Sequence, residues 1–376
     1  MRIGYDAKRI THNKTGLGNY GRFIVKGLAS SFPDNDYYLY SINSGNKHLY
    51  EQLRNCTSIR FRYPERKLEH LFPALWRSHH ILRDLKQDKV DVFHGLSNEL
   101  PFGIRRSNIP SVVTVHDLIF LRYPDLYPPI DRCIYTYKFK KACLEADLVI
   151  AASQQTKADI IDCWKIKEEK IEVVYQGCDA SFYQPATEAQ KQEVRAKYSL
   201  SAPYILYVGS IEERKNLLTL VKAFEQLNDK TVKLIAIGRR TAYLKKVETY
   251  IQERHLQSRV GIFTSISSPD LPALYQMAEL FAYPSFHEGF GIPVLEALVS
   301  NTPVIAATGS CLEETGGTGS LYADPDDVHQ LKSLIESVLG TPSLAAKMRS
   351  EGKIHSQRFS AGALSQQLMT LYRGLM

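Results

Sequence analysis

Short apolar runs alternate with stretches of helical periodicity along the whole chain, which is typical of parallel sheets covered by helices. In the first half, the pattern predicts strands at residues 2–5, 37–42, 90–94, 111–115, 148–151 and 171–174. In the second half, it predicts strands at 204–208, 233–237, 260–263, 280–283 and 304–306, with helices at 217–227, 242–253 and 271–277 between them. The sequence therefore predicts an α/β fold with two doubly wound sheets.

The chain of 376 residues is long enough for two domains, each with its own core. The polar segment 179–202 separates the two series of strands, and we predict a hinge at Asp179 to Pro185. We predict a first Rossmann-like domain at residues 1–182 and a second at 183–357. Residues 358–376 are predicted to form a final helix, after a break near Ser360-Ala-Gly362.

The excess of positive over negative charge is confined to the first half of the chain. Residues 1–200 hold 30 Lys and Arg against 23 Asp and Glu, whereas residues 201–376 hold 17 of each. Within the first half, residues 60–68 alternate basic side chains (Arg60, Arg62, Arg66, Lys67) with apolar ones. This segment suits peripheral contact with an anionic membrane surface. An ordinary solvated basic face is an equal alternative, and we expect no nucleic-acid partner.

No apolar run approaches the roughly 20 residues that span a bilayer, and the first residues lack the apolar core of a signal peptide. The six cysteines show neither a Cys-x-x-Cys pair nor a metal-like spacing. We therefore expect a cytoplasmic protein, either free or at the inner face of the cell membrane. Cys133 and Cys143 are predicted to be buried small hydrophobes of one helical stretch and not a redox pair.

Two acids, Glu288 and Glu296, bracket a glycine-containing segment between a predicted strand and a helix. Gly289 and Gly291 free backbone N–H groups around Phe290, and the positive end of the helix favours an anion, so we predict a seat for a diphosphate. Glu288 flanks this seat, and Glu296 can accept hydrogen bonds from a ribose diol. That both acids are merely solvated charges at a helix start is the alternative.

The segment 288–296 resembles the Glu-x7-Glu motif of the retaining glycosyltransferases of family 4. The likeness covers nearly the whole chain, because further segments occur in the order of that family: residues 115–118, 151–159, 173–179, 204–216 and 301–305. The resemblance implies the GT-B fold, in which two Rossmann-like domains face a central cleft. It also implies that the first domain binds the acceptor, that the second binds a nucleotide sugar, and that the last helix crosses back onto the first domain.

Arg214 and Lys215 follow the first predicted strand of the second domain, and the resemblance implies that they neutralise the departing nucleoside diphosphate. Cations that are fixed beside a leaving group stabilise the transition state more than the ground state. Many members of the family carry an arginine directly after Gly209, where this chain has Ser210, and we expect Arg214 to substitute for it. Asn216 is predicted to cap the next helix. An exposed basic turn is the alternative.

His116 and Asp117 end another predicted strand, where a polar pair is not needed for packing. The resemblance implies that His116 contacts the donor sugar and that Asp117 orients the sugar or binds the acceptor. A His–Asp pair that satisfies itself in the core is the alternative interpretation.

The segment from Gly16 to Gly21 satisfies the Gly-x-Gly-x-x-Gly pattern of dinucleotide-binding folds, so an NAD(P)-dependent oxidoreductase has to be considered. In those folds the strand runs almost directly into the first glycine. Here about ten residues separate Asp6, at the end of the strand, from Gly16. The resemblance implies instead that Gly16 and Gly18 let the backbone approach the donor phosphates and the acceptor.

Two segments, residues 34–36 and 324–327, match the Asp-x-Asp pattern by which another glycosyltransferase fold holds a metal. We interpret the first as a turn before a strand and the second as the start of a helix. Because Arg214 and Lys215 are available to neutralise a diphosphate, we predict no metal and no cofactor besides the nucleotide sugar as co-substrate.

These observations together predict a retaining hexosyltransferase that acts in cell-surface polysaccharide or glycolipid synthesis. Its expected substrates are a nucleotide sugar, GDP-mannose first of all, and a hydroxyl of a glycan or lipid-linked glycan. Retention and the identity of the sugar come from the resemblance and not from spacing. A UDP-sugar-dependent transferase of the same fold is the alternative. An NAD(P)-dependent oxidoreductase and a non-catalytic nucleotide-sugar-binding protein are the alternatives from other classes.

Overall fold

The computed structural model describes residues 1–376, and contacts within the chain divide them into two compact units. The N-terminal unit comprises residues 1–177 together with 359–376, and the C-terminal unit comprises residues 178–358. The boundary expected after residue 182 falls inside the short 3-10 helix Ala180–Tyr183 (η6), which already belongs to the C-terminal unit.

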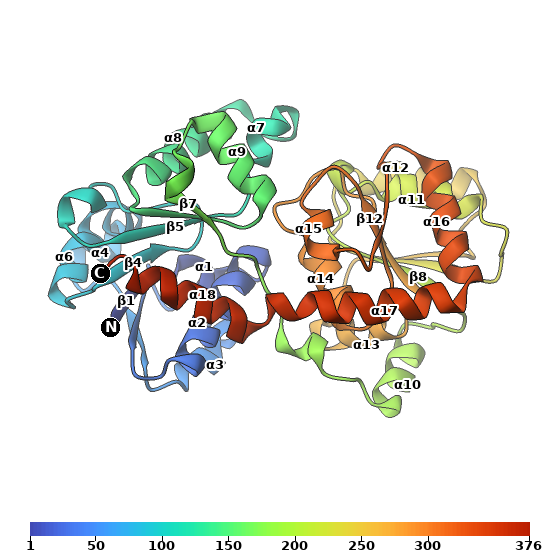
Figure 1. Ribbon diagram of the computed structural model, residues 1–376, viewed down its shortest axis with the longest axis horizontal. Coiled ribbons are helices and arrows are strands. Elements are labelled where there is room, and N and C mark those ends of the chain that lie inside the picture. The colour runs from blue at the N-terminus through green and yellow to red at the C-terminus, as the bar shows by residue number, and fades with distance from the viewer. The chain divides into compact units, whose positions relative to one another are not determined.

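The N-terminal unit is built on a seven-stranded sheet in the order β3-β2-β1-β4-β5-β6-β7, with all neighbours parallel (Figure 1). The strands are Arg2–Asp6 (β1), Asp36–Tyr40 (β2), Ile59–Arg62 (β3), Val92–Gly95 (β4), Ser111–Val115 (β5), Leu148–Ala151 (β6) and Ile171–Val173 (β7). The helices are Lys8–His12 (α1), Gly16–Ser31 (α2), Glu51–Arg54 (α3), Lys67–Leu71 (α4), Pro73–Leu75 (α5), Ile81–Gln87 (α6), Ile119–Arg122 (α7), Pro129–Glu145 (α8), Gln154–Trp164 (α9) and Ala361–Arg373 (α18).

The C-terminal unit repeats this plan with a six-stranded parallel sheet in the order β10-β9-β8-β11-β12-β13. Its strands are Tyr204–Val208 (β8), Lys233–Ile237 (β9), Val260–Phe263 (β10), Leu280–Tyr283 (β11), Val304–Ala307 (β12) and Leu321–Ala323 (β13). Its helices are Glu188–Lys197 (α10), Leu217–Glu225 (α11), Leu244–Glu253 (α12), Leu271–Gln276 (α13), Ile292–Val299 (α14), Leu312–Gly316 (α15), Val328–Gly340 (α16) and Pro342–Ser356 (α17).

Every strand predicted from the apolar runs is confirmed, with ends that shift by up to two residues. Strands β3 and β13 were missed, and both lie at an edge of their sheet. In β3, arginines alternate with apolar residues, so no apolar run marks the strand. In β13 only three residues are extended, too few for a periodic signal. The two missed strands are edge strands, although the other two edge strands, β7 and β10, were predicted.

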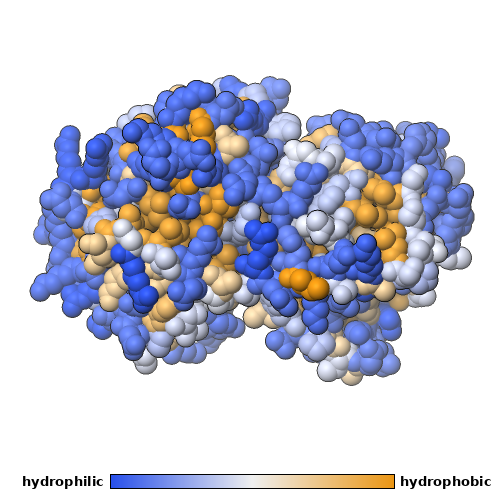
Figure 2. Space-filling view, viewed as in Figure 1, coloured by the Kyte–Doolittle hydropathy of each residue, from blue (hydrophilic) through white to orange (hydrophobic).

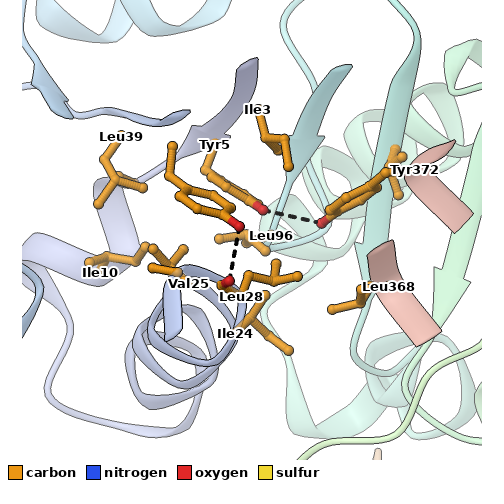
Figure 3. Packing of buried hydrophobic residues seen from close by; sticks show 14 of the residues in the cluster. Ile3, Tyr5, Ile10, Ile24, Val25, Leu28, Leu39, Leu96, Leu368 and Tyr372 are labelled. Atoms are coloured by element: carbon orange, nitrogen blue, oxygen red, sulfur yellow. Dashed lines mark hydrogen bonds between the residues drawn. The ribbon is translucent and has the colours of Figure 1, made fainter. Parts of the chain in front are cut away.

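The last helix, α18, belongs to the core of the N-terminal unit, where it packs against α2. Figure 3 shows Leu368 and Tyr372 of α18 among the apolar side chains of β1 and α2. The Tyr372 hydroxyl lies 2.6 Å from Nδ1 of His94, whose Nε2 lies 2.8 Å from the Thr114 hydroxyl. A buried chain of hydrogen bonds thus ties the helix to β4 and β5, although the helix is remote from both strands in sequence.

In the basic segment 60–68, Arg60 and Arg62 extend from β3 and pair with Asp36 at 3.0 Å and with Asp88 at 2.8 Å, and membrane contact through this segment stays a prediction. One expectation about a cysteine is wrong. Cys133 is exposed on α8 and not buried, whereas Cys143 of the same helix is buried as expected. All six cysteines are free thiols in the structure.

Truncating Leu368 to alanine should lower the free energy of unfolding by about 2–5 kcal/mol, because the side chain is fully buried and its removal leaves a cavity. Gln366→Ala, at an exposed position of the same helix, is the matched control and should change it by less than about 0.5 kcal/mol. Chemical denaturation of both variants measures the difference. Equal stability of the two would show that α18 does not contribute to the core.

Candidate functional site

The site of the C-terminal unit lies where the strand order reverses. From β8 the chain winds toward β9 and β10 on one side, and β11, β12 and β13 follow on the other side. Ligands of open parallel sheets bind beyond the carboxyl ends of the two strands that flank such a switch point. Here those strands are β8, which leads to Arg214 and Lys215, and β11, which leads to Glu288. The topology therefore brings together residues that are more than 70 positions apart.

Backbone hydrogen bonds hold the two loops against each other. The N–H of Phe286 donates to the carbonyl of Arg214 at 2.9 Å, and the Arg214 guanidinium donates to the carbonyl of His287. Helix α15 and its N-cap also hold the loop. The thiol of Cys311, the N-cap residue, contacts the carbonyl of Glu288 at 3.0 Å, and the Thr315 hydroxyl donates to the carbonyl of Phe290. The loop after β11 is thus fixed by its neighbours along most of its length.

Four side chains converge on one oxygen of Glu288. Its Oε1 accepts hydrogen bonds from the hydroxyls of Tyr283 and Ser285, both at 2.9 Å. The same oxygen lies 3.1 Å from Nη1 of Arg214 and 3.7 Å from Nζ of Lys215. The Lys215 ammonium also donates to the Tyr283 hydroxyl at 2.9 Å, so that the phenol connects the cation to the acid. We call Glu288, Arg214, Lys215 and Tyr283 the charged cluster.

The charged cluster determines the ionisation of Glu288. Burial alone would raise the pKa of this carboxyl, but the charges of Lys215 and Arg214 and the two hydroxyl donors outweigh burial and lower the pKa to about 2. Glu288 is therefore ionised at neutral pH. Two cations therefore face Glu288 in a site that is largely shielded from water, and a second acid, Glu212, lies 3.0 Å from Arg214.

Glycines shape the same site. A Cβ on Gly209 would lie 3.2 Å from the Lys215 side chain and 3.3 Å from the Tyr283 ring, so the bare backbone leaves room for both. Gly291 has a φ of +98°, and a Cβ there would lie 2.5 Å from Leu312. Helix α14 begins directly after Gly291, at Ile292, so its first turn faces the loop that carries Glu288.

Glu296, one turn into α14, differs from Glu288 in its ionisation. Its Oε2 accepts a hydrogen bond from the Tyr275 hydroxyl at 3.0 Å. The pKa of Glu296 is raised to about 7, mainly by burial and to a smaller extent by the charge of Asp179. The hydrogen bond from Tyr275 and the charge of Lys215 act in the opposite direction. Lys215 and Glu296 are thus close enough for one charge to act on the other. The two glutamates of the motif lie in one region but ionise about five pKa units apart.

The structure contradicts one sequence expectation beside Lys215, whereas the substitution by Arg214 for an arginine missing at Ser210 stays a prediction. Asn216 does not cap α11 with its side chain: it has a φ of +57°, and its Nδ2 donates instead to the carbonyl of Pro325 at 2.7 Å. Ser210 donates to Glu212 at 3.1 Å, and the same carboxylate oxygen lies 3.0 Å from Nη2 of Arg214. Arg214 therefore stands between Glu212 and Glu288.

In the N-terminal unit, His116 follows β5 and is buried. Its Nε2 lies 2.8 Å from the carbonyl of Leu96, and its Nδ1 lies 3.0 Å from the amide nitrogen of Gln176. Because a carbonyl only accepts and an amide NH2 only donates, the proton resides on Nε2. Burial lowers the pKa of His116 to about 4, so the ring is neutral at physiological pH. The Asp117 carboxylate accepts a hydrogen bond from the N–H of Ile119 at 3.2 Å.

The glycine-rich segment opens α2, as expected, but a helix that was not predicted, α1, stands between β1 and Gly16. This arrangement differs from a dinucleotide fold, in which the strand enters the glycine turn directly. A Cβ on Gly18 would lie 2.0 Å from the carbonyl oxygen of Asn13, so this glycine is required for packing, whereas Gly16 has open space around it. Beside them is a hollow of about 260 Å³, lined by Lys8, Arg9, His12, Asn13, Lys14 and Thr15.

Sequence reasoning missed the tyrosines that hold the two glutamates. Tyr283 ends β11, and Tyr275 lies in α13. In the sequence pattern, both tyrosines look like ordinary apolar positions of their elements. A signal for Tyr283 was present, because it directly precedes the Pro-Ser that starts the glutamate loop, and Ser285 is itself a donor to Glu288. No signal marked Tyr275, whose contact with Glu296 depends on how α13 packs against α14.

The two Asp-x-Asp segments have structural roles, as the sequence indicated. Asp327 caps α16 by accepting the N–H of Gln330 at 2.8 Å, and Asp36 begins β2. The structure brings together no group of three or more His, Cys, Asp or Glu side chains suited to a metal ion. A reaction without metal stays a prediction. None of the helices combines the length and the apolar composition that crossing a bilayer demands.

Comparisons with known proteins match both halves of the chain. Residues 16–182 match the model of "Glycosyltransferase Family 4", and residues 190–355 match that of "Glycosyl transferases group 1". Over 386 aligned residues the chain is 28% identical to the O-antigen chain mannosyltransferase B of Escherichia coli, covering 99% of this chain and all of the relative. It is 29% identical to the O-antigen chain mannosyltransferase RfbU of Salmonella typhimurium, covering 62% of each.

Solved structures agree on the fold. A glycosyltransferase from Rickettsia africae superposes with a TM-score of 0.78 at 20% identity, over all of this chain and 98% of the other. HepE from Anabaena, in complex with UDP and glucose, superposes with a TM-score of 0.77 at 19% identity, over the full length of both. At these identities the superpositions establish the fold alone.

The raised pKa of Glu296 predicts a pH dependence of stability. Between about pH 4.5 and 7 the folded state holds a proton on Glu296 that the unfolded state has lost, so this contribution to stability falls as pH rises through about 7. Glu296→Gln keeps the Tyr275 contact and removes the titration. The buried, neutral His94 and His116 act in the opposite direction, so the quantity to measure is the difference in free energy of unfolding between wild type and Glu296→Gln from pH 5 to 8. A constant difference would show that Glu296 has an ordinary pKa.

Proposed function

The chain belongs to the family 4 glycosyltransferases of GT-B fold, and we propose that it transfers mannose from GDP-mannose to a hydroxyl of a growing glycan, with retention at the anomeric carbon. Glycosyl transfer follows from membership of the family. The choice of mannose is supported by the two relatives above, both of which are mannosyltransferases of O-antigen chains.

The observation that carries the proposal is the charged cluster beside the first turn of α14. Its two adjacent cations, Arg214 and Lys215, together with the positive end of the helix, suit the diphosphate of a nucleotide sugar. Because Arg214 and Lys215 are held by hydrogen bonds before any ligand arrives, little reorganisation is needed when charge develops on the leaving group. This is the preorganisation that stabilises a departing nucleoside diphosphate.

The proposed reaction breaks the bond between the anomeric carbon and the diphosphate oxygen and forms a bond from that carbon to the acceptor oxygen on the same face. The proton of the acceptor hydroxyl passes to the departing phosphate oxygen. The positive charges of Lys215 and Arg214 stabilise the negative charge that accumulates on the departing phosphate oxygen. Glu288, ionised and bound to both cations, is proposed to accept hydrogen bonds from sugar hydroxyls through Oε2, because Oε1 already has its donors.

Glu296 is proposed to hold the ribose diol. A carboxyl with a pKa near 7 gains from losing its proton when two hydroxyls donate to it, so nucleotide binding should release protons at neutral pH. Gly289, Phe290 and Gly291 are proposed to supply the backbone that the diphosphate approaches. Gly209 and Ser210 line the proposed donor site from the end of β8, and Ser210 acts through its contact with Glu212.

In the N-terminal unit, His116 is proposed to contact the sugar through its position and not as an acid or base. Its ring is neutral and both nitrogens already have protein partners, so it has no proton to exchange near neutral pH. Asp117 is proposed to orient the sugar or to bind the acceptor. Gly16 and Gly18 are proposed to let the start of α2 approach the reactants.

A UDP-sugar is the second candidate donor, because the structural neighbour HepE was solved in complex with UDP and glucose. The charged cluster does not distinguish the bases, since it addresses the diphosphate common to both. We further propose that the acceptor is a glycan or lipid-linked glycan of cell-surface polysaccharide or glycolipid synthesis, and that the protein works in the cytoplasm at the inner face of the membrane.

A donor panel tests the function directly. Ligands that bind only the folded protein raise its melting temperature, so GDP and GDP-mannose should stabilise it more than UDP-, ADP- or TDP-sugars at equal concentration. Radiolabelled mannose should then pass to acceptor glycan with release of GDP. Preferential stabilisation by UDP-sugars would replace GDP-mannose by the second candidate. Stabilisation by NADPH alone would contradict the transferase function and favour an oxidoreductase. Binding of a nucleotide sugar without any release of nucleoside diphosphate would contradict it as well and favour a non-catalytic binding protein.

Lys215→Ala and Glu288→Ala should each lower kcat by at least about a hundredfold, the scale found when one preorganised charged contact is removed. Glu296→Ala should chiefly raise the Kd of the nucleotide, because it lacks the ribose contact. Initial rates and isothermal titration separate the two effects.

The matched control is Lys245→Ala, which removes an exposed lysine of α12 in the same unit and should leave kcat unchanged. Normal turnover in both Lys215→Ala and Glu288→Ala would show that the charged cluster is structural. Melting curves of each variant verify that the fold is retained.

A further inference from the structure

Tyr283, the last residue of β11, has no exposed surface, and neighbouring rings hold it in place. Its ring lies 5.7 Å from that of Phe281 in the same strand and 5.7 Å from that of Tyr207 in β8. A Cβ on Gly209 would lie 3.3 Å from the Tyr283 hydroxyl, so this glycine leaves room for it. Figure 2 shows blue, hydrophilic groups over much of the C-terminal unit, whereas the phenol lies beneath the surface. The hydroxyl therefore has protein partners in place of water.

The Tyr283 hydroxyl donates one hydrogen bond and accepts another. It donates to Oε1 of Glu288 at 2.9 Å and accepts from the Lys215 ammonium at 2.9 Å. Burial and the nearby charge of Glu288 raise the pKa of the phenol well above its usual range, so the proton stays on the oxygen. An ammonium can only donate and an ionised carboxylate can only accept, so the direction of both bonds is fixed.

Lys215 does not bind Glu288 directly. Its Nζ lies 3.7 Å from Oε1 of Glu288, which is beyond hydrogen-bonding distance. The same Oε1 accepts from the hydroxyls of Tyr283 and Ser285, both at 2.9 Å, and lies 3.1 Å from Nη1 of Arg214. With three donors around it, this oxygen has no lone pair left for a fourth. The phenol thus occupies the place that the ammonium would take beside the acid.

The Lys215 ammonium keeps donors that the protein does not use. An ammonium has three N–H groups, and the Tyr283 hydroxyl is the one hydrogen-bond acceptor that the structure gives to that of Lys215. Two N–H groups therefore have no acceptor within the protein, although the side chain is only 14% exposed. Phosphate oxygens are acceptors of the kind that such a cation binds.

We infer that Tyr283 is a positioning residue for sugar transfer: its hydroxyl keeps the Lys215 ammonium out of direct contact with Glu288 and leaves two N–H groups of that ammonium for the diphosphate. This role rests on the proposed function and adds a residue to the same site. Without the hydroxyl, Oε1 of Glu288 loses a donor and the ammonium can move onto it. The resulting ion pair would satisfy both charges within the protein and draw the cation away from the leaving group.

Tyr283→Phe removes the hydroxyl and keeps the ring. With the nucleotide sugar that the donor panel selects, the variant should lower kcat at least about tenfold, the scale expected when one hydrogen bond to a charged group is lost. KM should change by less than about threefold, because the lost support acts on charge that develops in the transition state. Initial rates over a range of donor concentrations separate the two quantities.

Tyr204→Phe is the matched control. Tyr204 begins β8, is buried in the same sheet, and donates from its hydroxyl to the carbonyl of Leu274 at 2.6 Å. The variant thus also loses a buried hydroxyl and its hydrogen bond, but at the opposite end of the strand from Lys215. It should keep the wild-type kcat even if its melting temperature falls.

A double-mutant cycle distinguishes positioning from a general loss of structure. If Tyr283 acts through Lys215, Tyr283→Phe should lower kcat by less than about twofold in the Lys215→Ala background, because the ammonium that it positions is gone. A structural effect would lower kcat by the same factor in both backgrounds.

The outcomes separate the role of Tyr283 from the proposed function. A wild-type kcat in Tyr283→Phe, or equal factors in the two backgrounds, would overturn the role of Tyr283 and leave the proposed function intact. If the wild type released no nucleoside diphosphate from any donor of the panel, the proposed function would be wrong, and the role of Tyr283 with it.

Discussion

A buried carboxylate is stable only when a cation or hydrogen-bond donors neutralise its charge. In the C-terminal unit, the neutralisation of Glu288 holds together the loops that follow β8 and β11. Its charge is balanced by Arg214 and Lys215 from the neighbouring loop, and Tyr283 joins acid to ammonium. Because unpaired charges of this kind would cost several kcal/mol each in a site with little water, the two loops have to stay together. The same contacts hold the cations in place for an incoming diphosphate, so stability and chemistry depend on one set of bonds.

Glu288 and Glu296 show how the environment gives two identical side chains different ionisation states. Glu288 meets two cations and two hydroxyls and is ionised, whereas Glu296 meets one phenol and keeps its proton up to about pH 7. In the N-terminal unit the buried histidines remain neutral because burial lowers the pKa of His94 to about 3 and that of His116 to about 4. Each unit thus fixes the protonation of its polar groups through burial and hydrogen bonds.

Periodicity and spacing were sufficient for the central strands, for the loop-to-helix position of Glu288 and Glu296, and for the placement of Arg214 and Lys215 after β8. They failed where a partner comes from elsewhere in the chain. The bond of Asn216 to Pro325, the pairing of Arg60 with Asp36 and the contact of Tyr275 with Glu296 join residues that local sequence cannot connect. Exposure of Cys133 was missed for a related reason, because α8 is apolar on both sides and its sequence does not reveal which side is covered.

The position of α18 has a consequence for how the protein is made. The N-terminal unit takes its last core helix from residues that follow the entire C-terminal unit in sequence. During synthesis, the side chains of α2 that later cover Leu368 and Tyr372 stay uncovered until residues 361–373 leave the ribosome. The N-terminal unit is therefore the second to be completed, although its first strand emerges before any other. Apolar surface that is exposed during such an interval is prone to aggregation.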